Sequence, residues 1–191
     1  PRSGHGFGGP VLDRCFPITK DRDSSQGALE PREVPRWGKR LQLVATGAQL
    51  RFEPVVRNFN QLCANIFVNN VNHRVTPVHR ALSDTKSTTS IHIDPVSTGV
   101  STIEGDHADL ERESFSESEQ IRCIVFDDEY SYSDRNIFIK IDVEGYEEHV
   151  IRGMQKTLQH NSVILQVEVL TDGRTEGLTQ LLNSLGFRFL R

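Results

Sequence analysis

The sequence lacks the features typical of membrane proteins, zinc proteins and nucleic-acid-binding proteins. Its 191 residues include only three cysteines, which are far apart and form no CxxC pair. This spacing argues against a zinc site and favours a reducing, cytoplasmic setting. No apolar run reaches the ~18 residues needed to cross a membrane, and no signal peptide is visible. The formal net charge of −4 argues against general binding to nucleic acid.

The composition is that of one soluble globular domain preceded by an irregular segment. Hydrophobic residues make up 36% of the chain and charged residues 25%. Residues 1–35 hold five of the eight prolines and a polar stretch at 20–27, so we predict an irregular or poorly ordered segment there. The folded domain is predicted to span 36–191. Because the first residue is not Met, we expect the sequence to be a fragment.

Helical and strand patterns alternate through the predicted domain. A helix is predicted to end at Gly47, because one helical face would carry Trp37, Leu41 and Val44 or Ala45. We predict further helices at 55–69, 146–159 and 175–185, and strands at 49–53, 74–82, 88–93, 121–126, 136–141, 162–169 and 187–190. The polar stretch 95–120 is expected to be a solvated loop or a weak helix. This order predicts βαβ units and a parallel sheet covered by helices, and the apolar strand 162–169 should be covered on both faces.

Polar side chains recur where these predicted strands end. They are Glu53, Ser83 with Asp84, Asp142 with Glu144, and Glu168. Ligands of open parallel sheets bind beyond the carboxyl ends of the strands. One acid in such a place is typical of a helix cap or a solvated turn, whereas recurrence after several strands favours a site. A carboxylate there can accept both ribose hydroxyls of an adenosine-containing cofactor, and each charge-assisted bond is worth roughly 1.5–3 kcal/mol.

Five segments resemble the FkbM family of S-adenosylmethionine-dependent methyltransferases. They are RFEPVVRNFNQLCANIFVNN (51–70), HRALSD (79–84), FIKIDVEGYEEHVIRGMQKTL (138–158), VILQVEV (163–169) and LLNSLGFRFL (181–190), and their order and spacing fit as well. The resemblance implies an α/β fold of the class I methyltransferase type. That fold is a Rossmann-like, mostly parallel sheet with helices on both faces and one antiparallel strand near the end. We expect the sheet of this chain to be incomplete at both ends.

The same resemblance implies a site for S-adenosylmethionine at these strand ends. Glu53 would hold the ribose, with Phe52 and Pro54 shaping the adenine side of the site. Ser83 and Asp84 would lie near the adenine edge.

The methyl donor and the acceptor would meet at Asp142 and Glu144. Asp142 is the first candidate for a base or an orienting group and would also touch the cofactor, whereas Glu144 is either a second such group or a helix cap. Glu168 would face the acceptor. His149 is either a substrate contact and proton acceptor or an ordinary residue of the helix face. No histidine pair has the spacing of metal ligands, and we predict no metal site.

One family motif is not recognisable. A glycine-rich loop of the form D-x-G-A-N-x-G should precede Glu53, but the chain there reads DSSQGALEPREVPRWG (23–38), with no apolar strand before it and no tight glycine spacing. Pro31 and Pro35 would also break a helix across that turn. Three explanations remain open. They are a shifted reading frame or misplaced start, a degenerate family member, and an atypical loop that still serves.

The leading functional hypothesis is O-methylation, dependent on S-adenosylmethionine, of a hydroxyl on a sugar or another small metabolite. The alternative is a non-catalytic, degenerate fragment that acts through contacts with another protein. A nicotinamide-dependent reductase is disfavoured because the glycine-rich GHGFGG (4–9) has no predicted apolar strand before it and the chain has no Tyr-x-x-x-Lys pair. The expected partner is the hydroxyl acceptor, with no nucleic acid and no membrane. The identity of the acceptor and the oligomeric state are not predicted.

Overall fold

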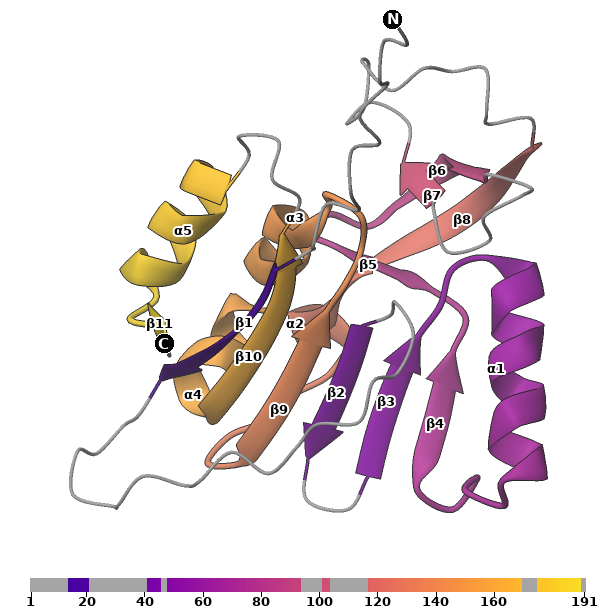
Figure 1. The fold of residues 1–191 in the computed structure, drawn as a ribbon, viewed down its shortest axis with the longest axis horizontal. Coiled ribbons are helices and arrows are strands. Elements are labelled where there is room, and N and C mark those ends of the chain that lie inside the picture. Colours follow the sequence, from indigo (N-terminus) through magenta and orange to yellow (C-terminus); the bar gives the residue numbers. More distant parts are fainter. Residues whose placement is uncertain are drawn as a thin grey trace, which may run out of the picture.

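The computed structural model describes residues 14–20, 41–45, 48–93, 101–103, 117–169 and 175–189 (Figure 1). The main sheet contains β1 (Arg14–Lys20), β2 (Leu41–Ala45), β3 (Ala48–Phe52), β4 (Val75–Val78), β9 (Asn136–Ile141), β10 (Ser162–Val169) and β11 (Arg188–Phe189). A second sheet contains β5 (Ala81–Ser83), β6 (Ser87–Ile93), β7 (Ser101–Ile103) and β8 (Glu117–Val125). The helices are α1 (Val56–Val68), α2 (Phe126–Glu129), α3 (Glu147–Arg152), α4 (Gln155–His160) and α5 (Thr175–Ser184).

Strand direction in the main sheet differs from the prediction. The strand order is β11-β1-β10-β9-β2-β3-β4. Four of the six pairings that the described strands form in this sheet are antiparallel, so the expectation of a mostly parallel sheet is wrong. The reason is that β1 and β2 run against their neighbours. The other five strands, β3, β4, β9, β10 and β11, still point the same way, because β2 is antiparallel to both β3 and β9 and β1 is antiparallel to both β10 and β11.

The segment predicted as a helix around Leu41 is the strand β2. It forms a hairpin with β3 in which Leu41 pairs with Phe52 and Ala45 with Ala48. Five residues are too few for apolar periodicity to separate a helix from a strand, and pairing on both sides decides for the strand. Trp37 and the stretch 23–38, where the glycine-rich loop was sought, lie outside the described residues.

Most other elements lie where the sequence predicts them. However, β7 and the start of β8 lie in the stretch 95–120 that was predicted to be a loop or a weak helix, and the short α2 was not predicted. Three further differences concern longer segments. Strand β1 lies inside the segment that was predicted to be irregular. The predicted strand 74–82 is divided into β4 and β5, which belong to different sheets. The predicted helix 146–159 is divided into α3 and α4, because the Asp127 carboxylate accepts the backbone N–H groups of Lys156 (2.6 Å) and Thr157 (3.0 Å) and so starts a new helix.

The core lies on one face of the main sheet. Alternate residues of β9 and β10, such as Ile139 and Leu165, are fully buried against Ile151 and Leu158 of the helices α3 and α4. Each such side chain contributes about 1.5–3 kcal/mol of hydrophobic stabilisation. In Figure 1, α2 and α4 lie behind these strands. Ile164, on the opposite face of β10, is 38% exposed, so the prediction that this strand is covered on both faces is wrong here.

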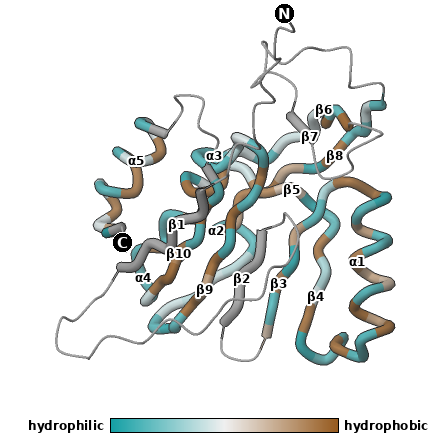
Figure 2. Tube along the Cα trace, viewed as in Figure 1, coloured by the Kyte–Doolittle hydropathy of each residue, from teal (hydrophilic) through white to brown (hydrophobic). Residues whose placement is uncertain are grey.

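Helix α1 packs beside β4 and is amphipathic, which the alternating brown and teal bands in Figure 2 show. Its buried residues are Leu62 and Ile66. The described helices are all too short or too polar to span a lipid bilayer.

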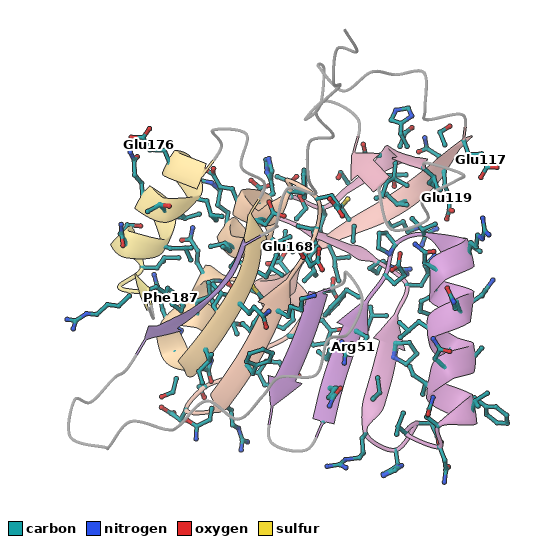
Figure 3. All side chains as sticks on the ribbon, in the orientation of Figure 1. Arg51, Glu117, Glu119, Glu168, Glu176 and Phe187 are labelled. Atoms are coloured by element: carbon teal, nitrogen blue, oxygen red, sulfur yellow. The ribbon has the colours of Figure 1, made fainter. Side chains whose placement is uncertain are left out.

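The second sheet is attached where β3 and β4 end. Its small core is formed by Val55, Ala81, Ile91, Ile93, Ile121 and Cys123. Val55 directly precedes α1, and the N–H of Val56 donates to both carboxylate oxygens of Glu119 on β8, at 3.0 and 3.2 Å. Glu119 is labelled in Figure 3. A carboxylate at a helix N-terminus is favourable by about 0.3–1 kcal/mol. Part of the stretch 95–120, which was predicted to be a solvated loop or a weak helix, is therefore strand β8 and holds α1 to the second sheet.

Gly153 provides a test of how α3 packs on β5. A Cβ atom on Gly153 would lie 2.0 Å from the carbonyl oxygen of Ser83. We expect Gly153→Ala to lower the free energy of unfolding by about 1–3 kcal/mol, since backbone would have to move. The measurement is denaturant unfolding followed by circular dichroism.

Gly177→Ala is the matched control for that substitution. The nearest atom to its Cβ would be the mobile end of Glu148, at 3.1 Å. Because Ala is the better helix former, this change should raise the free energy of unfolding by about 0.5–1 kcal/mol. Equal effects of the two substitutions would contradict the packing described.

Candidate functional site

The strand register brings three of the predicted carboxylates to one edge of the main sheet. Pairing of β2 with both β3 and β9 sets Phe52 and Ile141, the last residues of those strands, at the same level. Glu53 and Asp142 follow them directly. Because Val167 pairs with Ile141, Glu168 on β10 lies level with Asp142; Glu168 is labelled in Figure 3. From strand spacing, the backbone of Asp142 is about 5 Å from that of Glu168 and about 10 Å from that of Glu53. The edge is the carboxyl edge of β3, β4, β9 and β10.

Glu53 is a buried carboxylate at the start of the turn into α1. It is 6% exposed, and its Oε1 accepts the N–H of Val55 at 3.1 Å. The carbonyl oxygen of Pro54, in the same turn, is 2.9 Å from Nε2 of His79. Glu53 therefore anchors this turn and also places negative charge at the sheet edge. Burial of that charge is costly without such hydrogen bonds.

Phe52 is part of the core rather than an open wall of the site. Its ring makes edge-on contacts with Phe126 (centroids 6.0 Å apart) and Tyr130 (5.9 Å). These contacts stiffen the end of β3, from which Glu53 projects. The adenine-side roles of Phe52 and Pro54 stay predictions.

Asp142 forms an ion pair that was not predicted from the sequence. Its Oδ2 lies 2.8 Å from Nζ of Lys140, and both side chains are largely buried. Positions i and i+2 of a strand point to the same face, and this spacing in KID is the signal that could have revealed the pair. Removing one partner of a buried pair typically costs about 3–5 kcal/mol. Lys140 thus holds Asp142 in one orientation.

The turn after β9 is held by a carboxylate other than the one predicted. Glu144 (φ 55°) and Gly145 (φ 99°) have left-handed backbone conformations. Glu147, in the first turn of α3, is buried and accepts the N–H of Gly145 at 3.0 Å. Burial raises the pKa of Glu147 above its ordinary value, although backbone hydrogen bonds, including that from Gly145, act in the opposite direction. Glu144 itself is half-buried, and the N-cap residue of α3 is Tyr146.

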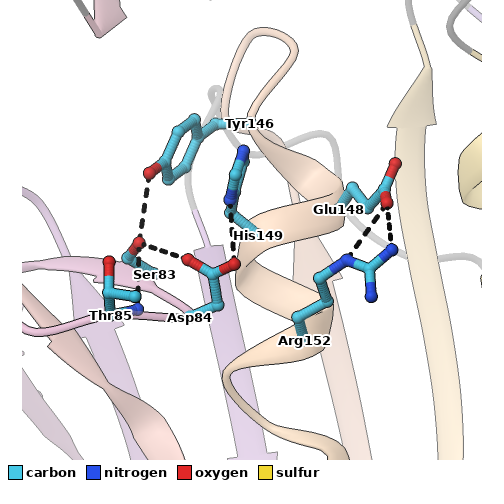
Figure 4. A network of polar contacts seen from close by, with 7 residues as sticks. All are labelled: Ser83, Asp84, Thr85, Tyr146, Glu148, His149 and Arg152. Atoms are coloured by element: carbon cyan, nitrogen blue, oxygen red, sulfur yellow. Dashed lines mark hydrogen bonds and ion pairs between the residues drawn. The ribbon is translucent and has the colours of Figure 1, made fainter.

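Ser83, Asp84 and His149 meet in one polar network (Figure 4). The Ser83 hydroxyl donates to Oδ1 of Asp84 at 3.2 Å, and Nδ1 of His149 lies 3.2 Å from Oδ2 of Asp84. Tyr146, which was not predicted, joins the network: its hydroxyl is 3.1 Å from Oγ of Ser83, and its ring stacks on His149 with centroids 4.3 Å apart. The network ties the end of β5 to the turn after β9. Its chain positions are more than 60 residues apart, so only the fold reveals it.

The whole site lies within the region matched by a known family. A model of the FkbM methyltransferase domain matches residues 32–189. The chain belongs to the FkbM methyltransferase family. No curated protein and no solved structure matches this FkbM chain. Among the residues that the structure describes, no group of three His, Cys, Asp or Glu side chains is placed to hold a metal ion.

The left-handed backbone of Glu144 predicts that Glu144→Gly stabilises the protein. A residue with a Cβ pays about 1–2 kcal/mol in this conformation, partly offset by the greater freedom of Gly in the unfolded chain. We expect the free energy of unfolding to rise by about 0.5–1 kcal/mol. Gly145→Ala, which puts a Cβ on the neighbouring residue, should instead lower it. Thermal and denaturant unfolding measure both changes, and a loss of stability in Glu144→Gly would contradict the conformation of the turn.

Proposed function

We propose that this FkbM domain is an S-adenosylmethionine-dependent methyltransferase that acts on a hydroxyl of a sugar or another small metabolite. The observation that carries the proposal is the register: Glu53 and Asp142 stand at the same level of one carboxyl edge, separated by a single strand. Ligands of α/β sheets bind beyond this edge. The network of Ser83, Asp84 and His149 lies against the turn that follows Asp142.

The polar side chains at this edge of the sheet suit a nucleoside cofactor that carries a positive charge. Glu53 supplies a buried carboxylate for the ribose hydroxyls, and Ser83 and Asp84 supply polar atoms for the adenine edge. The acidic groups at this edge, including Asp142 at the start of the turn after β9, attract a positively charged sulfonium group. When bound, S-adenosylmethionine supplies a methyl group that is already activated for transfer.

The residues of the chain then have to orient the acceptor and receive its proton. The ion pair with Lys140 fixes Asp142, which makes it the first group to orient the hydroxyl or accept its proton. Glu144 lies in the same turn and is the second candidate. Glu168, level with Asp142 on the neighbouring strand, faces the acceptor side, and His149 is a further substrate contact held by Asp84.

One observation favours the second candidate function, a non-catalytic domain that acts through protein contacts. The place between β3 and β9 is taken by β2, which runs antiparallel to both. Its first residue, Leu41, therefore lies at the carboxyl edge between Glu53 and Asp142. A glycine-rich loop that follows a parallel strand is not present among the described residues at this place.

Calorimetry with S-adenosylmethionine and S-adenosylhomocysteine tests the proposal. We expect micromolar binding of both ligands, and a loss of about tenfold or more in Glu53→Gln, which removes the charge but keeps an acceptor for the N–H of Val55. Glu117→Gln removes the same charge from an exposed position of β8 and should bind like the wild type. If the folded wild type binds neither ligand, the methyltransferase proposal fails and the non-catalytic alternative stands.

A further inference from the structure

We propose that Glu147 is a positioning residue of this site: its carboxylate fixes the turn 142–146 and thereby sets the affinity for the methyl donor. The inference rests on the proposed function, because the turn carries Asp142 and Glu144. Neither the pattern of strand ends nor the resemblance to the family pointed to Glu147.

The backbone of the turn wraps around the Glu147 carboxylate. The N–H of Gly145 donates to Oε1 at 3.0 Å, and backbone groups of Val143 and of Glu147 itself lie near enough to this carboxylate to lower its pKa. The left-handed conformations of Glu144 and Gly145 turn the chain so that these groups converge. Successive backbone N–H groups in such a turn form a concave site for an anion. Here the anion is a side chain of the same molecule.

The turn is held at both of its ends as well. Asp142 is bound by Lys140 at its start, and Tyr146 contacts Ser83 and stacks on His149 at its end. Glu147 is therefore the group that holds the middle of the turn. Loss of its negative charge would weaken the hydrogen bond from the N–H of Gly145, because a neutral oxygen accepts less strongly than a carboxylate, and would loosen the left-handed turn at Glu144.

Few charged groups act on Glu147. Glu144, in the turn, raises its pKa, but less than burial does. Other titratable groups on or beside α3 are paired with one another: His149 with Asp84, Glu148 with Arg152, and, in the preceding turn, Asp142 with Lys140. Glu176 lies in the first turn of α5, a helix that contacts α3. Because burial raises the pKa of Glu147, it takes up a proton at a higher pH than an exposed glutamate does.

The sign of the pH effect separates a positioning role from a purely structural one. A carboxyl group whose pKa is raised by folding stabilises the fold most when it is protonated, and this contribution is lost as the pH rises through the folded pKa. Acidification should therefore increase the contribution of Glu147 to the free energy of unfolding. At the same time it protonates the carboxylate that holds the turn. The affinity for the methyl donor and the contribution of Glu147 to stability should therefore change in opposite directions with pH.

The test is binding of S-adenosylhomocysteine by calorimetry to the wild type, Glu147→Gln and Glu148→Gln between pH 5 and 8, with denaturant unfolding of each protein. We expect Glu147→Gln to weaken binding about tenfold near neutral pH, without a matching loss of stability. The affinity of the wild type for S-adenosylhomocysteine should fall on acidification. The share of this fall that comes from protonation of Glu147 should be absent in Glu147→Gln. Glu148→Gln removes the same charge one residue further on, where Glu148 contacts Arg152, and should bind like the wild type at every pH.

Two results would overturn the inference. Equal affinity and equal pH dependence in the wild type and Glu147→Gln would remove the positioning role while leaving the proposed function intact. Absence of binding by the folded wild type would remove both. If Glu147→Gln does not fold, the wild type decides: a folded wild-type protein whose affinity does not fall on acidification also overturns the role.

Discussion

The site depends on the pairing of β2 with both β3 and β9. This double antiparallel pairing makes β3 and β9 parallel to each other and sets their last residues level. Glu53 and Asp142 consequently emerge at one edge, although they are far apart in the chain. A shift of one residue in either pairing would move the side chains of a strand to the opposite face and break this alignment. The same strand occupies the centre of the edge, so it both aligns the carboxylates and limits the space between them.

Each buried carboxylate of the site is held by a different local partner. Glu53 accepts the N–H of Val55, Asp142 pairs with Lys140, and Glu147 accepts the N–H of Gly145. Such partners are required because an uncompensated buried charge costs several kcal/mol. The arrangement keeps desolvated negative charge at a fixed place, at some cost to stability, which is typical of sites selected for function rather than for stability. The left-handed Glu144 adds to that cost.

Sequence reasoning predicted the parts of the fold whose signals are long and local. The apolar segments of β9 and β10 and the amphipathic α1 were correct in type and nearly in extent. The reversed β2 could not be predicted, since five residues carry no decisive periodicity and its strand character comes from its neighbours. The family resemblance pointed to Glu53 and Asp142 as site candidates, which the register aligns. It could not show that Glu147 rather than Glu144 is the buried acid, because that depends on backbone torsions inside the turn.

We propose that the polar groups beyond β3, β5 and β9 form a single site for a nucleoside cofactor. A crystal structure of the protein with S-adenosylhomocysteine tests it most directly. We expect the ribose hydroxyls on the Glu53 carboxylate, the adenine beside Ser83 and Asp84, and the sulfur on the side of Asp142. The ligand bound elsewhere, or the carboxyl edge filled by the chain that enters β2 with no room for the ligand, would contradict it.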